Sequence, residues 1–329
     1  MSLVNGGEAD SEYIVRMTGD VVGEQATDSS RVGVKTARLA ELARAGIPVP
    51  EGFAVTASAY REFVRDARLE PVIAQEIRRY RAGRDAVVSA AEIRSAFGDE
   101  PLPPVVVDDI VAAYEALGGE GTEVAVRCSP RTAADGVQDD VFLHLTTAQD
   151  VLAACRRCFA SLFNTVALGN REALGVDHLR VAMPVLVQRM VHADLGGSGT
   201  ARGANTLVRV SASWGLGEPP PAGADQYSVH PGARPLIVKH HGDKPAKTVY
   251  AEPRGTRAVP TTSDERAGFV LTDEELQELA RWSVLADEHF RRPMTLEWAK
   301  DGLSGELYLL EVRLGVAPEL MILARGRSD

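Results

Sequence analysis

The sequence predicts an α+β protein with two lobes, and three features of the chain support this prediction. At 329 residues, the chain suits either one large domain or two lobes, and two lobes are favoured. Residues 66–120 carry helical periodicity between charged or proline-rich breaks, whereas residues 225–270 consist of short strands and turns. Helices and strands grouped along the chain in this way are typical of α+β folds. We expect an N-terminal segment over 1–30, one lobe over 31–190 and a second over 191–329.

Composition limits the classes of partner. Hydrophobic residues make up 45% of the chain and charged residues 25%, which is ordinary for a globular protein. No apolar run approaches the roughly 20 residues of a membrane span, and the first residues do not form a signal-peptide pattern. These features predict a cytoplasmic protein with no membrane partner. The net charge of -10 argues against nucleic acid as a partner but leaves room for a local basic phosphate site.

The three cysteines do not form a disulfide framework. Cys155 and Cys158 make a CxxC pair inside a helical pattern, without a second pair or nearby histidines. Buried thiols are therefore the favoured interpretation, ahead of zinc or redox chemistry.

A lysine follows a glycine at the start of a predicted helix. Gly33 marks a turn, Lys35 stands at the helix entry, and Gly46 ends the helix. Thr56 or Ser58 is expected to cap the next helix. A lysine beside a helix N-terminus can contact phosphate, and a solvated surface lysine is the alternative.

An arginine follows a short buried strand. Glu123–Val126 has the pattern of that strand, Arg127 emerges at its end, and Arg131 and Asp135 lie in the loop beyond. An arginine in this position can clamp a phosphate through two parallel hydrogen bonds. A structural pair between one of these arginines and Asp135 is the alternative.

The middle of the chain predicts a long amphipathic helix over Gln149–Leu168 and an apolar strand over Val181–Val191. This strand turns polar at Gln188, Arg189 and Met190, where backbone groups can meet a purine edge. Gly196, Gly197 and Gly199 are expected to form a flexible connection. The later Gly-Leu-Gly stretch in SWGLGE is weak evidence for a site by itself.

The stretch Thr295–Arg313 has the pattern of a β-hairpin with its turn near Ser304. That register places Glu297 opposite Glu311, with Arg313 diagonal to Glu297. Like charges opposed across two strands are destabilising, so the pair calls for a cation such as a divalent metal carrying phosphate oxygens. A surface hairpin whose acids face water is the alternative.

Together these segments resemble the N-terminal nucleotide-binding domain of the phosphoenolpyruvate synthase, pyruvate phosphate dikinase and rifampicin phosphotransferase family. The resemblance covers about Arg31–Arg313 as a stand-alone, divergent copy. It rests on VGVKTARLAELARAGIPVPEGFAVT, VAVRCS, CRRCFASLF, VAMPVLVQRMV, SWGLGE, LTDEELQELA, DEHF and LEWAKDG followed by LYLLEVR.

The resemblance implies a two-lobed ATP-grasp fold with ATP between the lobes. By position, Lys35 and Arg127 correspond to catalytic, triphosphate-binding cations. The resemblance further implies an adenine hinge at Gln188, Arg189 and Met190, magnesium ligands at Glu297 and Glu311, and a phosphate contact at Arg313. ATP and Mg²⁺ are the implied cofactors. The family passes phosphate from ATP to a histidine on a separate swivelling domain, so a histidine-domain or substrate-domain protein is the implied partner.

The chain departs from the family pattern at several positions. Val34 replaces a glycine before Lys35 and puts a side chain where backbone amides should approach phosphate. The loop that covers the phosphates is shortened to Gly136–Val141, which reduces the exclusion of water. The family strand before SWGLGE has become Gly197–Ala201. Two further changes are Ala134-Asp135 for an acidic pair and Leu314 for a proline, while Glu311 for glutamine preserves metal binding.

Two functions stay open on this basis. The chain is an ATP-dependent phosphotransferase module acting on a histidine or a small molecule supplied in trans, or it is a degenerate nucleotide-binding or regulatory homologue without catalysis. The retained charges favour the first and the lost glycine favours the second. A carboxylate–amine ligase is a weaker third option, because ATP-grasp folds also host acyl-phosphate chemistry. We expect the chain to end before any swivelling histidine domain.

Overall fold

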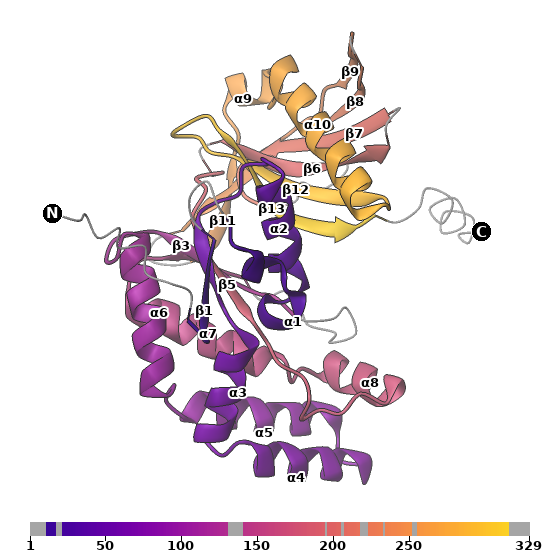
Figure 1. The fold of residues 1–329 in the computed structure, drawn as a ribbon. Helices are drawn as coiled ribbons and strands as arrows, with labels where there is room; N and C mark the ends of the chain where they lie inside the picture. Colours follow the sequence, from indigo (N-terminus) through magenta and orange to yellow (C-terminus); the bar gives the residue numbers. More distant parts are fainter. Residues whose placement is uncertain are drawn as a thin grey trace, which may run out of the picture. The chain divides into compact units, whose positions relative to one another are not determined.

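The structure is a computed structural model and describes residues 11–17, 22–130, 141–194, 196–204, 207–217, 223–232, 234–251 and 255–315. The chain divides into two compact units (Figure 1). Unit 1 comprises Met1–Arg44 and Glu51–Met190, and unit 2 comprises Ala45–Pro50 and Val191–Asp329. The short segment Ala45–Pro50 therefore belongs to unit 2, although it lies within the stretch 31–190 expected to form the first lobe. Helix and strand occur in both units, so the α+β class is confirmed.

Unit 1 is built on a five-stranded antiparallel sheet with the strand order β1-β2-β5-β3-β4. The central strand β5 is buried over its first four residues, the apolar Val185, Leu186 and Val187 and the polar Gln188. The strands are β1 (Ile14–Met17), β2 (Gly52–Val55), β3 (Val124–Cys128), β4 (Val141–Leu145) and β5 (Val185–Arg189).

Helices pack on this sheet around a cluster of aromatic rings. Tyr60 of α3 lies 5.5 Å from Phe159 of α7, and Phe63 lies 5.7 Å from Phe97 of α5, measured between ring centroids. Thr56 caps α3, since its side chain accepts from the Ala59 N–H. The helices are η1 (Glu24–Thr27), α1 (Ser29–Val32), α2 (Val34–Arg44), α3 (Ala57–Asp66), α4 (Glu70–Arg81), α5 (Ala86–Asp99), α6 (Pro104–Leu117), α7 (Ala148–Ser161) and α8 (Thr165–Leu174).

The long helix expected over Gln149–Leu168 is two helices, α7 and α8, which meet at a bend of 43°. Asn164 causes the break because its side chain accepts from the Ala167 N–H and donates to the Ser161 carbonyl. It therefore ends one helix and caps the next, so the prediction of a single helix was wrong. Among the described helices, none alone has the length and hydropathy of a membrane span, and α7 with α8 meets those criteria only as a bent pair.

The three cysteines are free and buried, as predicted. Burial raises the pKa of Cys155 to about 12, with a further contribution from Cys128. A thiol with so high a pKa carries almost no thiolate at neutral pH and is chemically inert.

Unit 2 is built on a six-stranded antiparallel sheet with the order β13-β12-β6-β7-β8-β9 and a separate two-stranded sheet, β10-β11. The first helix α9 and the long helix α10 each begin with a capping box, at Thr262 with Glu265 and at Thr272 with Glu275. The elements are β6 (Gly197–Ala204), β7 (Leu207–Trp214), β8 (Asp225–His230), β9 (Leu236–His240), β10 (Ala246–Tyr250), β11 (Thr256–Pro260), α9 (Ser263–Ala267), α10 (Asp273–Phe290), β12 (Met294–Lys300) and β13 (Leu307–Leu314).

One face of the six-stranded sheet packs against α10 (Figure 1). Alternate residues of β12, Leu296 and Trp298, point to this face and are buried, as are Trp282 and Leu279 of the helix. The alternating residues Thr295 and Glu297 of β12 point to the opposite face. This polar face carries the acids that the sequence singled out.

The glycine-rich segment expected to be a flexible connection is the strand β6. Its glycines serve close packing, because a Cβ at Gly199 would lie 1.9 Å from the Ser211 carbonyl oxygen of the adjacent strand. The prediction of a flexible connection was therefore wrong, since the absence of side chains here permits a tight strand pair.

Candidate functional site

Glu297 of β12 and Glu311 of β13 are directly opposite each other in the strand register. Their side chains are only 15% and 8% exposed, so water screens their repulsion weakly. The guanidinium of Arg313 lies against both: its Nη2 is 2.8 Å from Oε1 of Glu297, and its Nε is 2.8 Å from Oε1 of Glu311. The hairpin register predicted from the sequence is confirmed, and an internal cation already accompanies the two acids.

The same face of the sheet carries an apolar patch next to the carboxylates. Ala299 is two residues beyond Glu297 on β12, pairs with Tyr308 of β13 and is fully buried. It belongs to a cluster formed by Val191, Ala193 and Ala299 with the half-buried side chains of Leu216, Tyr308 and Leu310. Half-buried apolar side chains beside paired carboxylates suit a ligand with a flat apolar end and a charged end.

The Gly-Leu-Gly stretch shapes this patch. Gly215 and Gly217 have φ values of 87° and 86°, and the Ser198 hydroxyl lies 2.8 and 2.6 Å from their carbonyl oxygens. A Cβ at Gly215 would lie 2.5 Å from the Thr248 carbonyl oxygen. The turn needs glycines because both positions have positive φ, and it places Leu216 against the cluster. Glu218 lies outside the described residues.

Asp301 ties the hairpin turn to the segment that contains Val191. Its carboxylate accepts from the backbone N–H groups of Leu303, Ser304 and His192, at 2.8, 3.0 and 2.9 Å. Burial acts to raise the pKa of Asp301, but the three N–H donors outweigh it and hold the pKa below its usual value. The ionised carboxylate therefore stabilises the wall of the apolar patch.

In unit 1, Lys35 is on the first turn of α2, which is held by Ser129. The Ser129 hydroxyl accepts from the Thr36 N–H at 3.1 Å and from the Thr36 hydroxyl at 2.9 Å, and it donates to the Val32 carbonyl. Gly33 has φ 82°, and a Cβ there would lie 1.8 Å from the Ser129 carbonyl oxygen. The Lys35 helix is thereby fixed to the chain two residues after Arg127.

The Val34 amide is engaged as well, since its N–H donates to the Pro130 carbonyl at 3.0 Å. The sequence predicted that the Val34 side chain restricts access of phosphate to the backbone. This hydrogen bond provides a second reason, because a donor already bound to a carbonyl cannot also serve a phosphate oxygen at full strength.

Arg127 is half-buried on β3, and its Nε is a buried donor that finds no hydrogen-bond acceptor within the described part of the chain. Burying such a donor without an acceptor costs about 1–3 kcal/mol. An oxyanion would supply the missing acceptor and the counter-charge. Arg131 and Asp135, the alternative partners suggested by the sequence, lie outside the described residues.

The predicted hinge residues lie at the end of β5. Gln188 is buried, whereas the Arg189 guanidinium pairs with Glu51 at 3.4 Å and donates to the Leu117 carbonyl at the end of α6. The backbone N–H groups of Arg189 and Met190 donate to the carbonyls of Glu51 and Glu123, at 2.8 and 2.9 Å. These two amides are thus occupied inside unit 1. The sequence missed Val191, the next residue, which contributes to the apolar patch of unit 2.

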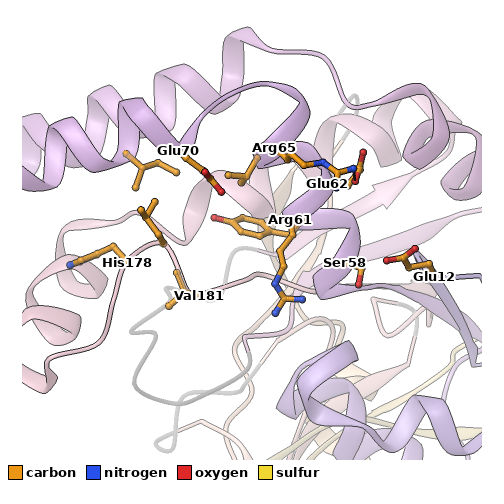
Figure 2. Close-up of a pocket in the computed structure, with 12 residues that line it drawn as sticks. Glu12, Ser58, Arg61, Glu62, Arg65, Glu70, His178 and Val181 are labelled. Carbon is orange, nitrogen blue, oxygen red and sulfur yellow. Dashed lines mark hydrogen bonds and ion pairs between the residues drawn. The ribbon is translucent and has the colours of Figure 1, made fainter.

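A separate cavity of about 350 Å³ in unit 1 contains none of the site residues predicted from the sequence (Figure 2). Arg65 reaches across to Glu62, with which it forms an ion pair, and Arg61 points away from them. His178 accepts at Nδ1 from Arg171 and contacts Glu172 through Nε2, and burial lowers its pKa. Because both ring nitrogens are engaged in structural contacts, the cavity is not a strong candidate for acid–base chemistry.

The donor set on the polar face of unit 2 fits magnesium. Within the described ranges, no group of three or more His, Cys, Asp or Glu side chains gathers around one point. Mg²⁺ usually binds through one or two carboxylates together with substrate phosphates and water, and Glu297 with Glu311 provides two such carboxylates. The cations Lys35 and Arg127 and the acids Glu297 and Glu311 all belong to helices or strands.

Comparison with known proteins agrees with this chemistry. Residues 29–316 match the family model described as the pyruvate phosphate dikinase AMP/ATP-binding domain. The phosphoenolpyruvate synthases of Deinococcus radiodurans and Pseudomonas aeruginosa are each 35% identical to this chain over 92% of its length, and that of Escherichia coli is 36% identical over 87%. The chain spans 41%, 42% and 40% of these relatives. It belongs to the pyruvate phosphate dikinase AMP/ATP-binding domain family, with the α+β, ATP-grasp-type fold predicted from its sequence.

Proposed function

We propose that this chain is a dikinase-type module that binds ATP with Mg²⁺ and passes a phosphoryl group to a histidine or a small molecule supplied in trans. The observation that supports it most is the pairing of Glu297 with Glu311 beside an apolar patch on one sheet face. The relatives named as phosphoenolpyruvate synthases support the same chemistry. A cytoplasmic location remains part of this proposal.

Each residue has a role that its surroundings allow. The apolar patch around Ala299 and Tyr308 would receive the adenine, while Glu297 and Glu311 would hold the metal. Bound Mg²⁺ would neutralise charge on the phosphates as the phosphoryl group departs. Arg313 would then turn part of its guanidinium from the carboxylates to a phosphate oxygen, because the metal takes over their neutralisation.

The cations of unit 1 would bind the triphosphate. Arg127 offers a buried Nε that finds no acceptor in the described residues, and phosphate oxygens are strong acceptors for a guanidinium. Lys35 would add a second positive charge from the α2 helix, whose first turn is fixed by Ser129. Phosphoryl transfer depends mainly on positioning and charge neutralisation, so these fixed cations are the required parts.

Calorimetric titration of ATP into the full chain, with and without Mg²⁺, tests this function. We expect binding in the presence of Mg²⁺ that weakens at least tenfold when the metal is removed, because the two carboxylates would then face the phosphates without a metal between them. Absence of binding at millimolar Mg²⁺ and ATP would contradict the proposed function.

A second candidate is a nucleotide-binding or regulatory homologue without catalysis. The engaged amide of Val34 favours it, since one backbone donor for phosphate is lost to Pro130. ATP turnover separates the two candidates. Release of ADP or AMP by the chain with an acceptor supports catalysis, whereas tight binding without turnover supports the regulatory role.

A further inference from the structure

A groove of about 650 Å³ lies in unit 2, between α10 and the segment that joins β8 to β9. Its floor includes Val229 and Ala280, which are buried, and the half-buried side chains of Val284 and Leu285 line it along the helix. Pro231, just after β8, borders it on the other side. The centre of the groove is therefore apolar.

The groove is on the face of the six-stranded sheet that α10 covers, whereas Glu297 points to the opposite face. The strand register joins buried residues of the α10 face on four strands: Val229 of β8, Val208 and Val210 of β7, Ala201 of β6 and Leu296 of β12. The sheet therefore separates the groove from the carboxylate pair.

The charged side chains that line the groove are mostly acidic. Glu274 and Glu288 are exposed on α10 and lie about 21 Å apart along the helix, at about 1.5 Å per residue. Arg281 is also in the lining, but it forms an ion pair with Glu278. Since Arg281 and Glu278 neutralise each other, the groove keeps a negative charge. An occupant that is apolar in its centre and basic beyond it would match this surface.

The sequence that follows β13 has this character. Residues 316–329 lie outside the described residues, and their sequence contains the apolar run Leu320–Ala324, LMILA. Glu319 precedes the run, and Arg325 and Arg327 follow it, so the positive charge is at one end. Consecutive apolar residues over this length are seldom left exposed to water without a function. The run therefore calls for an apolar surface to cover it.

This segment begins beside the C-terminal end of α10. The Gly315 N–H donates to the Pro293 carbonyl at 2.9 Å, shortly after α10 ends at Phe290. From Phe290 back to Glu274 the helix measures about 24 Å. The stretch from Gly315 to Arg325 can span about 33 Å when it is extended. It is therefore long enough to follow α10 back to Glu274.

We propose that residues 318–327 dock in the α10 groove of their own chain. The apolar run covers Val284 and Leu285, and the arginines that follow it lie beside Glu274. Docking buries apolar surface on both sides and pairs opposite charges at one end of the groove. It goes beyond the proposed function and does not depend on it, because the groove and the carboxylate pair are on opposite faces of the sheet.

Hydrogen exchange of the full chain, followed by mass spectrometry, tests the docking. The test variant is V284E, which puts a charge in the apolar groove, and the matched control is V87E, which changes an exposed valine of α5. In the parent and in V87E, we expect the backbone amides of residues 320–325 to exchange at least tenfold more slowly than in a free peptide of the same sequence. In V284E they should exchange at the rate of the peptide. Exchange at that rate in the parent, or equal protection in V284E, would overturn the docking.

A charge exchange tests the same contact without altering the apolar groove. R325E/R327E changes only residues of the segment, and we expect it to reduce the protection of residues 320–325. Adding E274R to this variant should restore part of the protection, because the opposite charges are then paired again. Protection that R325E/R327E leaves unchanged, or a loss that E274R does not reverse, would overturn the placement of the arginines beside Glu274.

Protein concentration distinguishes a segment of the same chain from that of a second copy. Docking within one chain is independent of concentration, so we expect the same protection of residues 320–325 in dilute and concentrated samples. Sedimentation velocity of the same samples measures self-association. Protection that appears only as the chain self-associates would assign the groove to a second copy and would overturn docking within one chain.

Discussion

Glu297 and Glu311 face each other on neighbouring strands, and a single guanidinium, that of Arg313, lies within 2.8 Å of both carboxylates. Two largely buried acids in this register are stabilised by a cation beside them. Arg313 provides that cation in the free protein, and a metal with phosphates can take its place. On the proposed function, the hairpin would have two charge-balanced states, one with and one without ligand.

The R313Q variant tests this exchange. Removal of the guanidinium leaves two opposed carboxylates, and we expect the free energy of unfolding to fall by roughly 1–3 kcal/mol. Millimolar Mg²⁺ should restore part of the loss, because the metal replaces the missing positive charge. Urea unfolding with and without Mg²⁺ measures both effects, and the control is R257Q, which removes an exposed arginine of β11. A loss that is insensitive to Mg²⁺ would contradict a cation site at this pair.

Ser129 is expected to position the helix that carries Lys35. In S129A the Thr36 N–H and hydroxyl lose their shared acceptor, which should cost about 1–3 kcal/mol of stability and weaken ATP binding. Ser89 is the matched control, because its hydroxyl is buried and finds no hydrogen-bond partner in the described part of the chain. S89A should be neutral or slightly stabilising. Thermal unfolding and ATP titration of both variants decide the point, and equal effects would refute the positioning role.

Arg127 should be important for ATP but not for the fold. Its Nε makes no hydrogen bond to the described residues, so R127Q removes an unsatisfied donor and should leave the free energy of unfolding unchanged or raise it by up to about 3 kcal/mol. ATP turnover should be abolished. Arg171 provides the contrast, because it is fully buried and donates to Leu162 and His178, so R171Q should destabilise the protein strongly. Parental turnover in R127Q would exclude Arg127 from the site.

Asp301 should make stability depend on pH. Its pKa is lowered in the folded protein, below the value of about 3.9 expected when unfolded. The stabilisation by its carboxylate is therefore complete above about pH 4 and is lost as the pH falls through the lowered folded pKa. D301N lacks this contribution, so the stability difference between parent and variant should be largest at pH 5–7 and should decrease as the pH falls below about 4. Urea unfolding across this range measures it, and a constant difference would contradict the assignment.

The hairpin and the cap of α3 could be predicted from sequence because their signals are local. The turn near Ser304 sets the register that pairs Glu297 with Glu311, and Thr56 and Thr272 cap their helices through side chains a few residues away. These relationships depend on residues close together in the chain.

The incorrect predictions depended on distant partners. In the sequence alone, Gly199 is typical of a flexible segment, and its role in packing depends on Ser211 of the adjacent strand. The β6 strand also pairs with β12, which is almost a hundred residues further along the chain. The engagement of the Arg189 and Met190 amides depends on Glu51 and Glu123, in two other parts of unit 1.

Binding of a non-hydrolysable ATP analogue to the E297Q variant, measured by calorimetry at several Mg²⁺ concentrations, tests the carboxylate pair most directly. The control is E288Q, which changes an exposed glutamate on α10. We expect the parent and E288Q to bind the analogue more tightly as Mg²⁺ increases, and E297Q to bind at least tenfold more weakly with little response to the metal. Parental affinity and parental Mg²⁺ dependence in E297Q would contradict the magnesium site at Glu297 and Glu311.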